Sequence, residues 1–582
     1  MTGSPRLLLA LAAVAVAFAA ADTYVVVLAL PDMMASAGIA VDQLQRAAPI
    51  VSGFLLGYVA MLPLIGRIAD LRGRVPVLVV ALIVFALGSL ITALAYDLPS
   101  MVTGRFLQGV GGGGLVPATL ALVADLYPAE RRGVPLGIVS AVQELGSVMG
   151  PLFGALVLAV ADWRVIFAIN LAVGLVLAAA IRAMAGRPVQ HQRPPGRLDW
   201  IGLALAVTAS VAGALVFVRP SQLLRDLTWG ELFVPFVAGG GRWATPLGAV
   251  AIGATILLVV RCFTARRPLL DLRSGLHTLR EADLVGALLL ALALGGVILA
   301  FATADPKVQV FSDQGLWYLL GSALATVALV LHLRRSAAPL VPTGALRPTP
   351  AWGAMLVSFF IGAALIAALI DIPLFARTTV YTSSQLMAAL VLVRFLVALP
   401  VGAVVGGYLT RTVGAGLITA AGMACAAAAF LWMATWGLES LESPVATVPL
   451  LLGGFGFGLA LAPVNAAVLA STDDDVHGLA TAFVVVSRMV GMLVGISALT
   501  TIGLRSYYAE QTELPPASEV CDGSSRCSEF TDLLKTAGIV QEQTVFTGAA
   551  VCAIAAGLLA LVLFRGAATR GVSTGDLLRA SG

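Results

Sequence analysis

Apolar runs of about 20 residues recur along the whole chain, each long enough to cross a hydrocarbon core of ~30 Å as a helix. Short segments rich in Arg, Asp, Gly or Pro separate them. Within lipid, a helix pairs its own backbone donors and acceptors. The pattern therefore predicts an all-α polytopic membrane protein. The predicted spans are residues 6–31, 47–66, 75–95, 101–126, 134–160, 164–184, 199–218, 246–264, 283–303, 316–333, 351–376, 385–410, 414–435, 447–471, 479–504 and 543–564.

Composition agrees with this pattern. The chain is 59% hydrophobic and 11% charged, with a mean hydropathy of +0.98, whereas ordinary soluble domains are about 25% charged. The formal net charge is +4, and most of the charged residues lie in the segments between the apolar runs. These segments contain no basic stripe with interleaved aromatic residues, so we expect no nucleic-acid partner.

The distribution of basic residues predicts the orientation. An even number of spans places both termini on one side, and cytoplasmic loops carry the excess of Lys and Arg. Most of the 35 Lys and Arg residues lie in loops on the side of the termini. We therefore expect a multi-pass membrane protein with both termini in the cytoplasm.

The first and last six spans resemble each other. Pro117 in the fourth span and Pro463 in the fourteenth lie in the same register. The glycine-flanked turn at residues 66–73 is likewise matched by residues 407–414. Two six-helix halves related by such a repeat place the substrate route between them.

A second repeat lies between the halves. Residues 197–203 and 281–287 open two similar hairpins, and residues 266–269 and 334–340 close them. This predicts a tandemly duplicated two-helix insert and a 6+4+6 plan, although the short tenth span leaves a 6+2+6 plan with fourteen spans open. The predicted units are residues 1–187, 196–346, 347–571 (with an outer loop at 505–540) and a cytoplasmic tail at 572–582.

Several motifs resemble the major facilitator superfamily. Residues 66–74 resemble its hinge signature Gly-x-x-x-Asp-x-x-Gly-Arg, and residues 105–109 its fourth-helix signature Arg-x-x-Gln-Gly. Residues 146–154 resemble the fifth-helix antiporter signature. Asp22-Thr23, followed by residues 29–31, resembles the first helix of drug:proton antiporters with extra central helices.

A narrower resemblance concerns residues 21–27, 143–147 and 485–493. They look like the mycobacterial triacylglyceride exporters that act with a lipid-carrying lipoprotein. Those exporters follow a 6+2+6 plan, so the second central hairpin of this chain is a departure from their pattern.

Charged residues within spans are costly and usually face a partner or a cavity. Glu144 lies roughly 18 Å and Arg488 roughly 17 Å beyond the inner ends of their spans, at 1.5 Å per residue. Both positions are therefore central and equivalent in the two repeats. We interpret Glu144 and Arg488 as a proton-coupling pair between the halves; the alternative is a static ion pair that fixes helix packing.

Four further charges lie within spans. The resemblance implies a proton or substrate-gating role for Asp22 and a relay or helix-orienting role for Arg105. Asp371 is supported only by its depth, which is similar to that of Asp22, and a helix-end contact is the alternative. Arg394 belongs to no motif, and we expect a structural partner for it.

The turn of the hinge motif predicts a cytoplasmic gate formed by Gly66, Asp70, Gly73 and Arg74. Arg411 occupies the equivalent position of the second repeat, so we expect it to oppose Asp70 and to latch the halves together. The alternative is a solvated loop whose charges only set the topology.

Two local features complete the list of candidate residues. The resemblance implies that Gly146, Gly150, Pro151 and Gly154 form a flexing gate helix, against the alternative of an inert kink. On the outer side, an oxidising compartment favours a disulfide between the two cysteines of the 505–540 loop, although free thiols remain the alternative. Those cysteines are Cys521 and Cys527.

The combined prediction is a transporter rather than an enzyme. We expect proton-coupled export of apolar or amphipathic substrates, with triacylglyceride-type lipids favoured by the narrower resemblance. A multidrug efflux antiporter and a non-transporting lipid-binding scaffold are the alternatives. The proton gradient is the expected energy source, with no cofactor and no metal site. We expect a monomer, with an extracytoplasmic lipoprotein as a partner.

Overall fold

The structure is a computed structural model of the 582-residue chain. It describes residues 5–39, 44–128, 131–184, 199–226, 228–237, 241–265, 268–302, 314–336, 338–342, 344–381, 384–515, 517–521, 527–567 and 569. The predicted tail at 572–582 lies outside this set.

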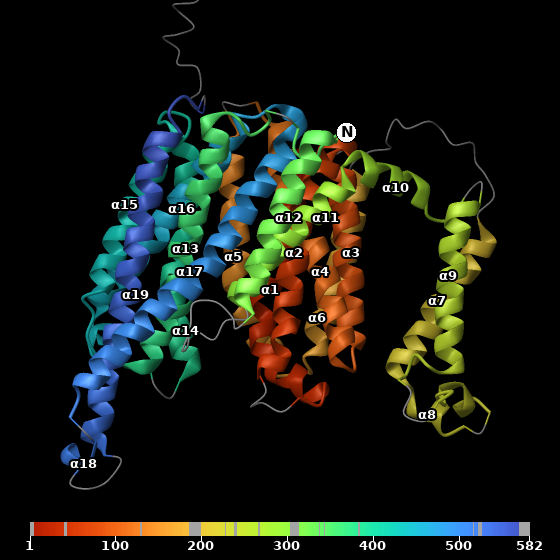
Figure 1. The fold of residues 1–582 in the computed structure, drawn as a ribbon, viewed down its shortest axis with the longest axis horizontal. Coiled ribbons are helices and arrows are strands. Elements are labelled where there is room, and N and C mark those ends of the chain that lie inside the picture. The colour runs from red at the N-terminus through yellow and green to blue at the C-terminus, as the bar shows by residue number, and fades with distance from the viewer. Residues whose placement is uncertain are drawn as a thin grey trace, which may run out of the picture.

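Six long helices form the N-terminal half (Figure 1). They are α1 (Pro5–Ser36), α2 (Leu44–Arg72), α3 (Arg74–Leu94), α4 (Leu98–Leu126), α5 (Gly133–Leu158) and α6 (Arg164–Met184). Gly73 separates α2 from α3 with a φ of 88°, a conformation that glycine adopts without the steric penalty of a Cβ atom. At the start of α4, Asp97 and Ser100 form a capping box, which pairs backbone donors that the first turn leaves free.

The insert contains four long helices and three short ones. They are α7 (Trp200–Val218), α8 (Ser221–Leu224), η3 (Gly230–Phe233), α9 (Pro246–Thr264), α10 (Leu272–Glu281), α11 (Leu284–Ala302) and α12 (Gly315–Arg335). Helices α7 and α9 form one hairpin, α11 and α12 form another, and α10 connects them (Figure 1).

Six long helices form the C-terminal half. They are α13 (Thr349–Thr378), α14 (Gln385–Leu409), α15 (Ala415–Met433), α16 (Thr447–Leu469), α17 (His477–Glu513) and α19 (Ser528–Leu563). The short helices η4 (Ser440–Glu442), η5 (Pro444–Ala446), η6 (Asp474–Val476) and α18 (Ala517–Val520) lie between them.

The described residues thus contain sixteen helices of 19 residues or more. Fifteen of these helices are long and apolar enough to cross a membrane. The remaining long helix is α5, with 26 residues. Among the described residues, all regular elements are helices. The predicted fold class, with two six-helix halves and a four-helix insert, is confirmed.

The two hairpins of the insert begin with the same polar cap. At the start of α7, the Asp199 carboxylate accepts hydrogen bonds from the Gly202 N–H at 3.0 Å and from Arg261 at 2.9 Å. The backbone N–H of Leu269 faces the same carboxylate. These donors, the Arg261 side chain first, hold the pKa of Asp199 below its usual range.

The second hairpin has an equivalent arrangement. At the start of α11, the Asp283 carboxylate accepts from the N–H groups of Gly286 at 3.0 Å and Leu340 at 2.9 Å. His332 stands where the first hairpin has Arg261, with its Nε2 atom 2.7 Å from Asp283. The shared hydrogen-bond plan supports the tandem duplication that the sequence predicts.

The two hairpins pack differently on the halves. Helix α11, paired with α12, lies against α2 and α17, and an apolar cluster that includes Leu64, Leu290, Leu329 and Leu479 fills the contact. Helices α7 and α9 stand apart at the right of Figure 1. Near Phe217, this first hairpin meets the α3–α4 connection, where its ring packs on that of Tyr96 with centroids 5.8 Å apart.

Two ends of the bundle can be named from their residues. The Asp70 end contains the α2–α3 turn and the starts of α1 and α17. At the opposite end, called the α18 end, α17 and α19 continue beyond the other helices and form an arm with α18 (Figure 1). The arm occupies much of the segment that the sequence predicts as a long outer loop.

Candidate functional site

A buried ion pair joins the two halves near the middle of the bundle. The Glu144 Oε1 atom of α5 lies 3.7 Å from the Arg488 Nη1 atom of α17, and each side chain is 10% exposed. Close helix packing holds Arg488 there, because Gly362 of α13 lets the backbone of α17 approach. The structure thus brings together the two residues that the sequence pairs across the repeat.

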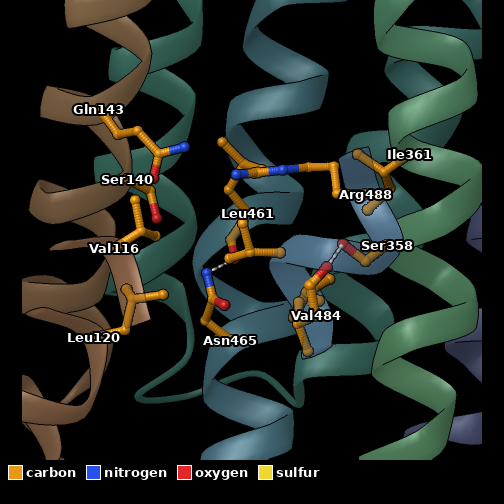
Figure 2. A pocket seen from close by; sticks show the side chains of 12 residues that line it. Val116, Leu120, Ser140, Gln143, Ser358, Ile361, Leu461, Asn465, Val484 and Arg488 are labelled. Carbon is orange, nitrogen blue, oxygen red and sulfur yellow. Dashed lines mark hydrogen bonds between the residues drawn. The ribbon is translucent and has the colours of Figure 1, made fainter. Parts of the chain in front are cut away.

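A small pocket between the halves adjoins this pair (Figure 2). Arg488 extends across it toward the helix that carries Ser140 and Gln143. On the opposite wall, Ser358 donates to the backbone of α17. Asn465 of α16 donates to its own helix, and its Oδ1 atom is buried without a hydrogen-bond partner. The pocket is therefore a polar spot inside an otherwise apolar interface.

A second charged network lies wholly within the N-terminal half. The Arg105 Nη1 atom lies 2.5 Å from Asp22 Oδ2 and donates to Gln108 Oε1 at 2.9 Å. Asn170 of α6 donates to Asp22 at 2.5 Å, and the Arg105 guanidinium lies 4.3 Å from the Phe54 ring centroid. Asn170 is not among the residues predicted from the sequence, because a single amide in an apolar helix matches no motif.

Aromatic rings of α2 connect the two charged sites. The ring of Phe54, which covers Arg105, lies 5.8 Å from the ring of Tyr58, centroid to centroid. Tyr58 is buried and lies within the electrostatic influence of both Glu144 and Arg488. Sequence reasoning does not single out Tyr58, because a tyrosine in an apolar run resembles an ordinary core residue.

At the Asp70 end, the hinge turn is held against the start of α17. The two oxygens of Asp70 accept the N–H groups of Gly478 at 2.8 Å and Leu479 at 3.0 Å. Arg74 lies 3.3 Å from the same carboxylate. A Cβ atom at Gly66 would lie 2.5 Å from the Gly478 carbonyl oxygen. An acid at a helix N-terminus is favourable, because it pairs free N–H groups and faces the positive end of the helix dipole.

Arg411 does not reach Asp70, contrary to the latch that the sequence suggests. Its guanidinium lies 5.1 Å from the ring centroid of Tyr408 in its own turn. The reason is geometric, because each turn faces a different helix of the other half. Gly66 meets the start of α17, whereas Gly407 meets Gly133 at the start of α5. The backbone contacts are symmetric, but the second one lacks a carboxylate cap.

The remaining intramembrane charges have local partners. Arg394 of α14 donates to the Thr447 hydroxyl of α16 at 3.1 Å. Thr447 is thus a local partner for Arg394, for which the sequence analysis expects a structural role. Asp371 of α13 lies in contact with a second acid, Glu542 of α19. Glu542 is missing from the sequence-based candidates, because the predicted last span begins one residue after it.

The glycines of the antiporter-like motif allow α5 to pack on α1. Gly146 and Gly150 meet the α1 backbone so closely that a Cβ atom at either position would clash. Gly154 is also buried. Pro151 lies within α5, but its side chain is outside the described set. These glycines are packing positions here, and the flexing of α5 stays a prediction.

Next to this contact, an apolar groove opens between α1 and α5. Phe18 of α1 and Leu145 and Met149 of α5 line it, and the last two side chains are exposed. Asp22 and Asn170 are the polar residues at the groove. An elongated apolar molecule could therefore lie against this face of the N-terminal half.

At the tip of the arm, a disulfide joins Cys521 and Cys527. Cys521 follows α18, and Cys527 caps the start of α19 by accepting the N–H of Phe530. The bond closes the connection between the two helices of the arm.

These observations define a class of protein: an α-helical membrane transporter fold, with two pseudo-symmetric halves and a charged centre between them. The chain belongs to the Major Facilitator Superfamily, whose family model matches residues 12–337.

Relatives of similar length support this assignment. The chain is 34% identical over 559 residues to a triacylglyceride transporter of Mycolicibacterium hassiacum, covering 94% of this chain and 88% of the relative. It is 33% identical over 519 residues to a triacylglyceride transporter of Mycobacterium tuberculosis, covering 87% and 84%.

Solved structures show the same fold at low identity. The human organic anion transporter MFSD10 is 14% identical with a TM-score of 0.54, and the match covers 96% of this chain and 100% of that one. The proton:xylose symporter XylE is also 14% identical, with a TM-score of 0.52 and 98% of each chain covered.

Proposed function

We propose that this protein is a proton-coupled exporter of apolar lipids of the triacylglyceride type, working by alternating access. The observation that carries the proposal is the Glu144–Arg488 pair, buried between the two halves. When Glu144 takes up a proton, its attraction to Arg488 disappears, and one contact between α5 and α17 weakens. Proton binding thereby favours a rearrangement of the halves.

The proposed orientation places the Asp70 end in the cytoplasm of a bacterium and the α18 end outside its plasma membrane. The excess of arginines at the Asp70 end supports this orientation, as does the disulfide of the arm, because disulfides persist in oxidising compartments. In this orientation, the glycine contacts at Gly66 and Gly407 close the cytoplasmic side.

Two observations support a lipid as the substrate. The mycobacterial relatives are named triacylglyceride transporters. The groove between α1 and α5 offers an apolar surface open to the side, as a substrate that arrives within the bilayer requires. The arm projects from the outer face, where a lipoprotein that accepts the lipid would dock.

The test is transport in proteoliposomes that contain a fluorescent triacylglyceride and an imposed proton gradient. We expect Glu144→Gln to abolish the gradient-dependent component, because the amide cannot exchange a proton. Arg488→Met should impair it as well. The matched control is Glu439→Gln, an exposed acid at the α18 end, which should transport normally.

Melting temperatures and gel filtration show whether each variant is folded. Gradient-driven transport that persists unchanged in both folded variants would refute proton coupling at this pair. Lipid binding with no gradient dependence in the wild type would indicate a scaffold, and transport of amphipathic cations instead of lipid would indicate a drug pump.

A further inference from the structure

Asp371 and Glu542 form a buried pair of acids in the C-terminal half. They are 4% and 2% exposed, respectively, and their side chains lie in contact where α13 packs on α19. The pair lies toward the α18 end, where α19 leaves the bundle and enters the arm. It is separate from the Glu144–Arg488 contact between α5 and α17.

No described basic side chain forms an ion pair with either acid. Two basic residues on the helices around the pair, Arg377 of α13 and Arg505 of α17, are exposed. On α19, Lys535 precedes Glu542 by two helical turns, about 10 Å. Just beyond the end of α15, the indole of Trp436 packs against Phe375 of α13 and Phe546 of α19. The acids beyond α15, Glu439 and Glu442, are exposed.

A hydrogen bond between two acids in contact requires a proton. Two ionised carboxylates offer only acceptors, so one of the two must carry an O–H group. Two like charges in buried contact also repel each other strongly, which disfavours ionisation of both groups.

The equivalent helix pair of the N-terminal half has different chemistry. By element order, α1 and α6 correspond to α13 and α19. There, Asp22 accepts from the amide of Asn170 and from Arg105. An amide and a guanidinium supply fixed donors, so Asp22 needs no proton of its own. In the C-terminal half, an acid occupies the partner position, and a bound proton must supply the donor.

We propose that Asp371 and Glu542 share one proton and form a proton-binding site in the C-terminal half, distinct from the Glu144–Arg488 pair. The shared proton holds α19 to α13 at the base of the arm. Its removal places two negative charges in contact and pushes the two helices apart. The site depends only on the contact between the acids and not on the proposed transport activity.

The experiment is infrared spectroscopy of the full-length protein in lipid nanodiscs. At a pH well above the ordinary carboxyl pKa of about 4, we expect the C=O stretch of a protonated carboxyl group, shifted in deuterium oxide. Carbonyl-labelled aspartate and, separately, glutamate in the wild-type protein assign the band without any mutation. We expect Glu542→Gln and Asp371→Asn to alter or remove the band.

Glu144→Gln is the matched control, because it removes a buried acid elsewhere and should leave the labelled band in place. The proposal is overturned if the wild type shows no protonated band at that pH, or if the band survives unchanged in both folded variants of the pair. It is also overturned if sodium or calcium ions abolish the band, since the site would then bind a metal cation. Loss of transport in Glu144→Gln with the band intact would separate this site from transport coupling.

Discussion

At the scale of single residues, the Asp22–Arg105 pair shows how a buried charge is retained. Each side chain is at most 1% exposed, and leaving either one unpaired in this surrounding is costly. Breaking a buried pair by removing one partner typically costs about 3–5 kcal/mol.

We therefore expect Asp22→Ala to lower the free energy of unfolding by about 3–5 kcal/mol, because Arg105 stays buried without its counter-ion. Thermal unfolding in detergent measures the change. The control is Glu281→Ala, which removes the acid of the exposed pair with Arg72 and should cost no more than about 1 kcal/mol. Equal effects of the two substitutions would contradict a buried, desolvated pair.

Asp199 gives a pH prediction at the same scale. Because its pKa is lowered in the folded protein, its stabilising effect is present above the pKa of the unfolded chain and is lost as the pH falls through the folded-state value. In Arg261→Gln, the largest cause of the lowering is removed, so the loss should occur at a higher pH. Carboxyl carbon NMR of labelled aspartate measures this midpoint; an unchanged midpoint would show that Arg261 does not interact with Asp199 in solution.

Sequence reasoning finds residues that stand out by charge and misses those defined by their surroundings. Glu144 and Arg488 are detectable, because opposite charges at equal depth in apolar helices need partners. Glu542 lies at the polar edge of its helix, where an acid looks like part of a loop. Arg411 is misplaced, because spacing along the chain does not show which backbone groups lie opposite.

At the scale of elements, glycine determines how closely helices of the two halves approach. The Gly66–Gly478 contact has no room for a Cβ atom, and the hydrogen bonds of Asp70 depend on that approach. Helix positions are largely predictable from hydrophobic periodicity. The arm is not, because the last turns of α17, up to Glu513, are polar and helical at once.

We expect Gly66→Ala to separate the halves at the Asp70 end, since the new methyl group would meet the Gly478 carbonyl. Distances between spin labels at two exposed positions, Leu71 and Leu417, should shift to longer values. Gly321→Ala is the control, because nothing lies within 4 Å of its added Cβ atom. Identical distance distributions in the two variants would argue against a closed contact at Gly66.

At the scale of the whole molecule, the duplicated insert suggests that one hairpin is dispensable for folding. The hairpin of α7 and α9 stands apart from the bundle, whereas that of α11 and α12 packs on both halves at Leu64 and Leu479. Periodicity predicts that the insert exists. It does not predict where each hairpin lies, because both have the same apolar pattern.

Deletion of residues 199–282 joins Leu198 to Asp283 and keeps the cap of the second hairpin intact. We expect the shortened protein to remain folded and monodisperse, with a melting temperature close to that of the full chain. Gel filtration and thermal unfolding measure both properties. The control is Arg72→Gln, which removes only the exposed contact to Glu281. Aggregation of the deletion variant while this control stays monodisperse would show that the first hairpin is structurally required.

The two glycine contacts at the Asp70 end have a mechanical consequence. Gly66 touches Gly478, and Gly407 touches Gly133, so two close backbone contacts join the halves at this end. Two points define a line, and bodies joined along a line can still rotate about it. In the proposed alternating access, the contacts that close this end would serve as a pivot, about which the opposite end widens or narrows without sliding of the halves.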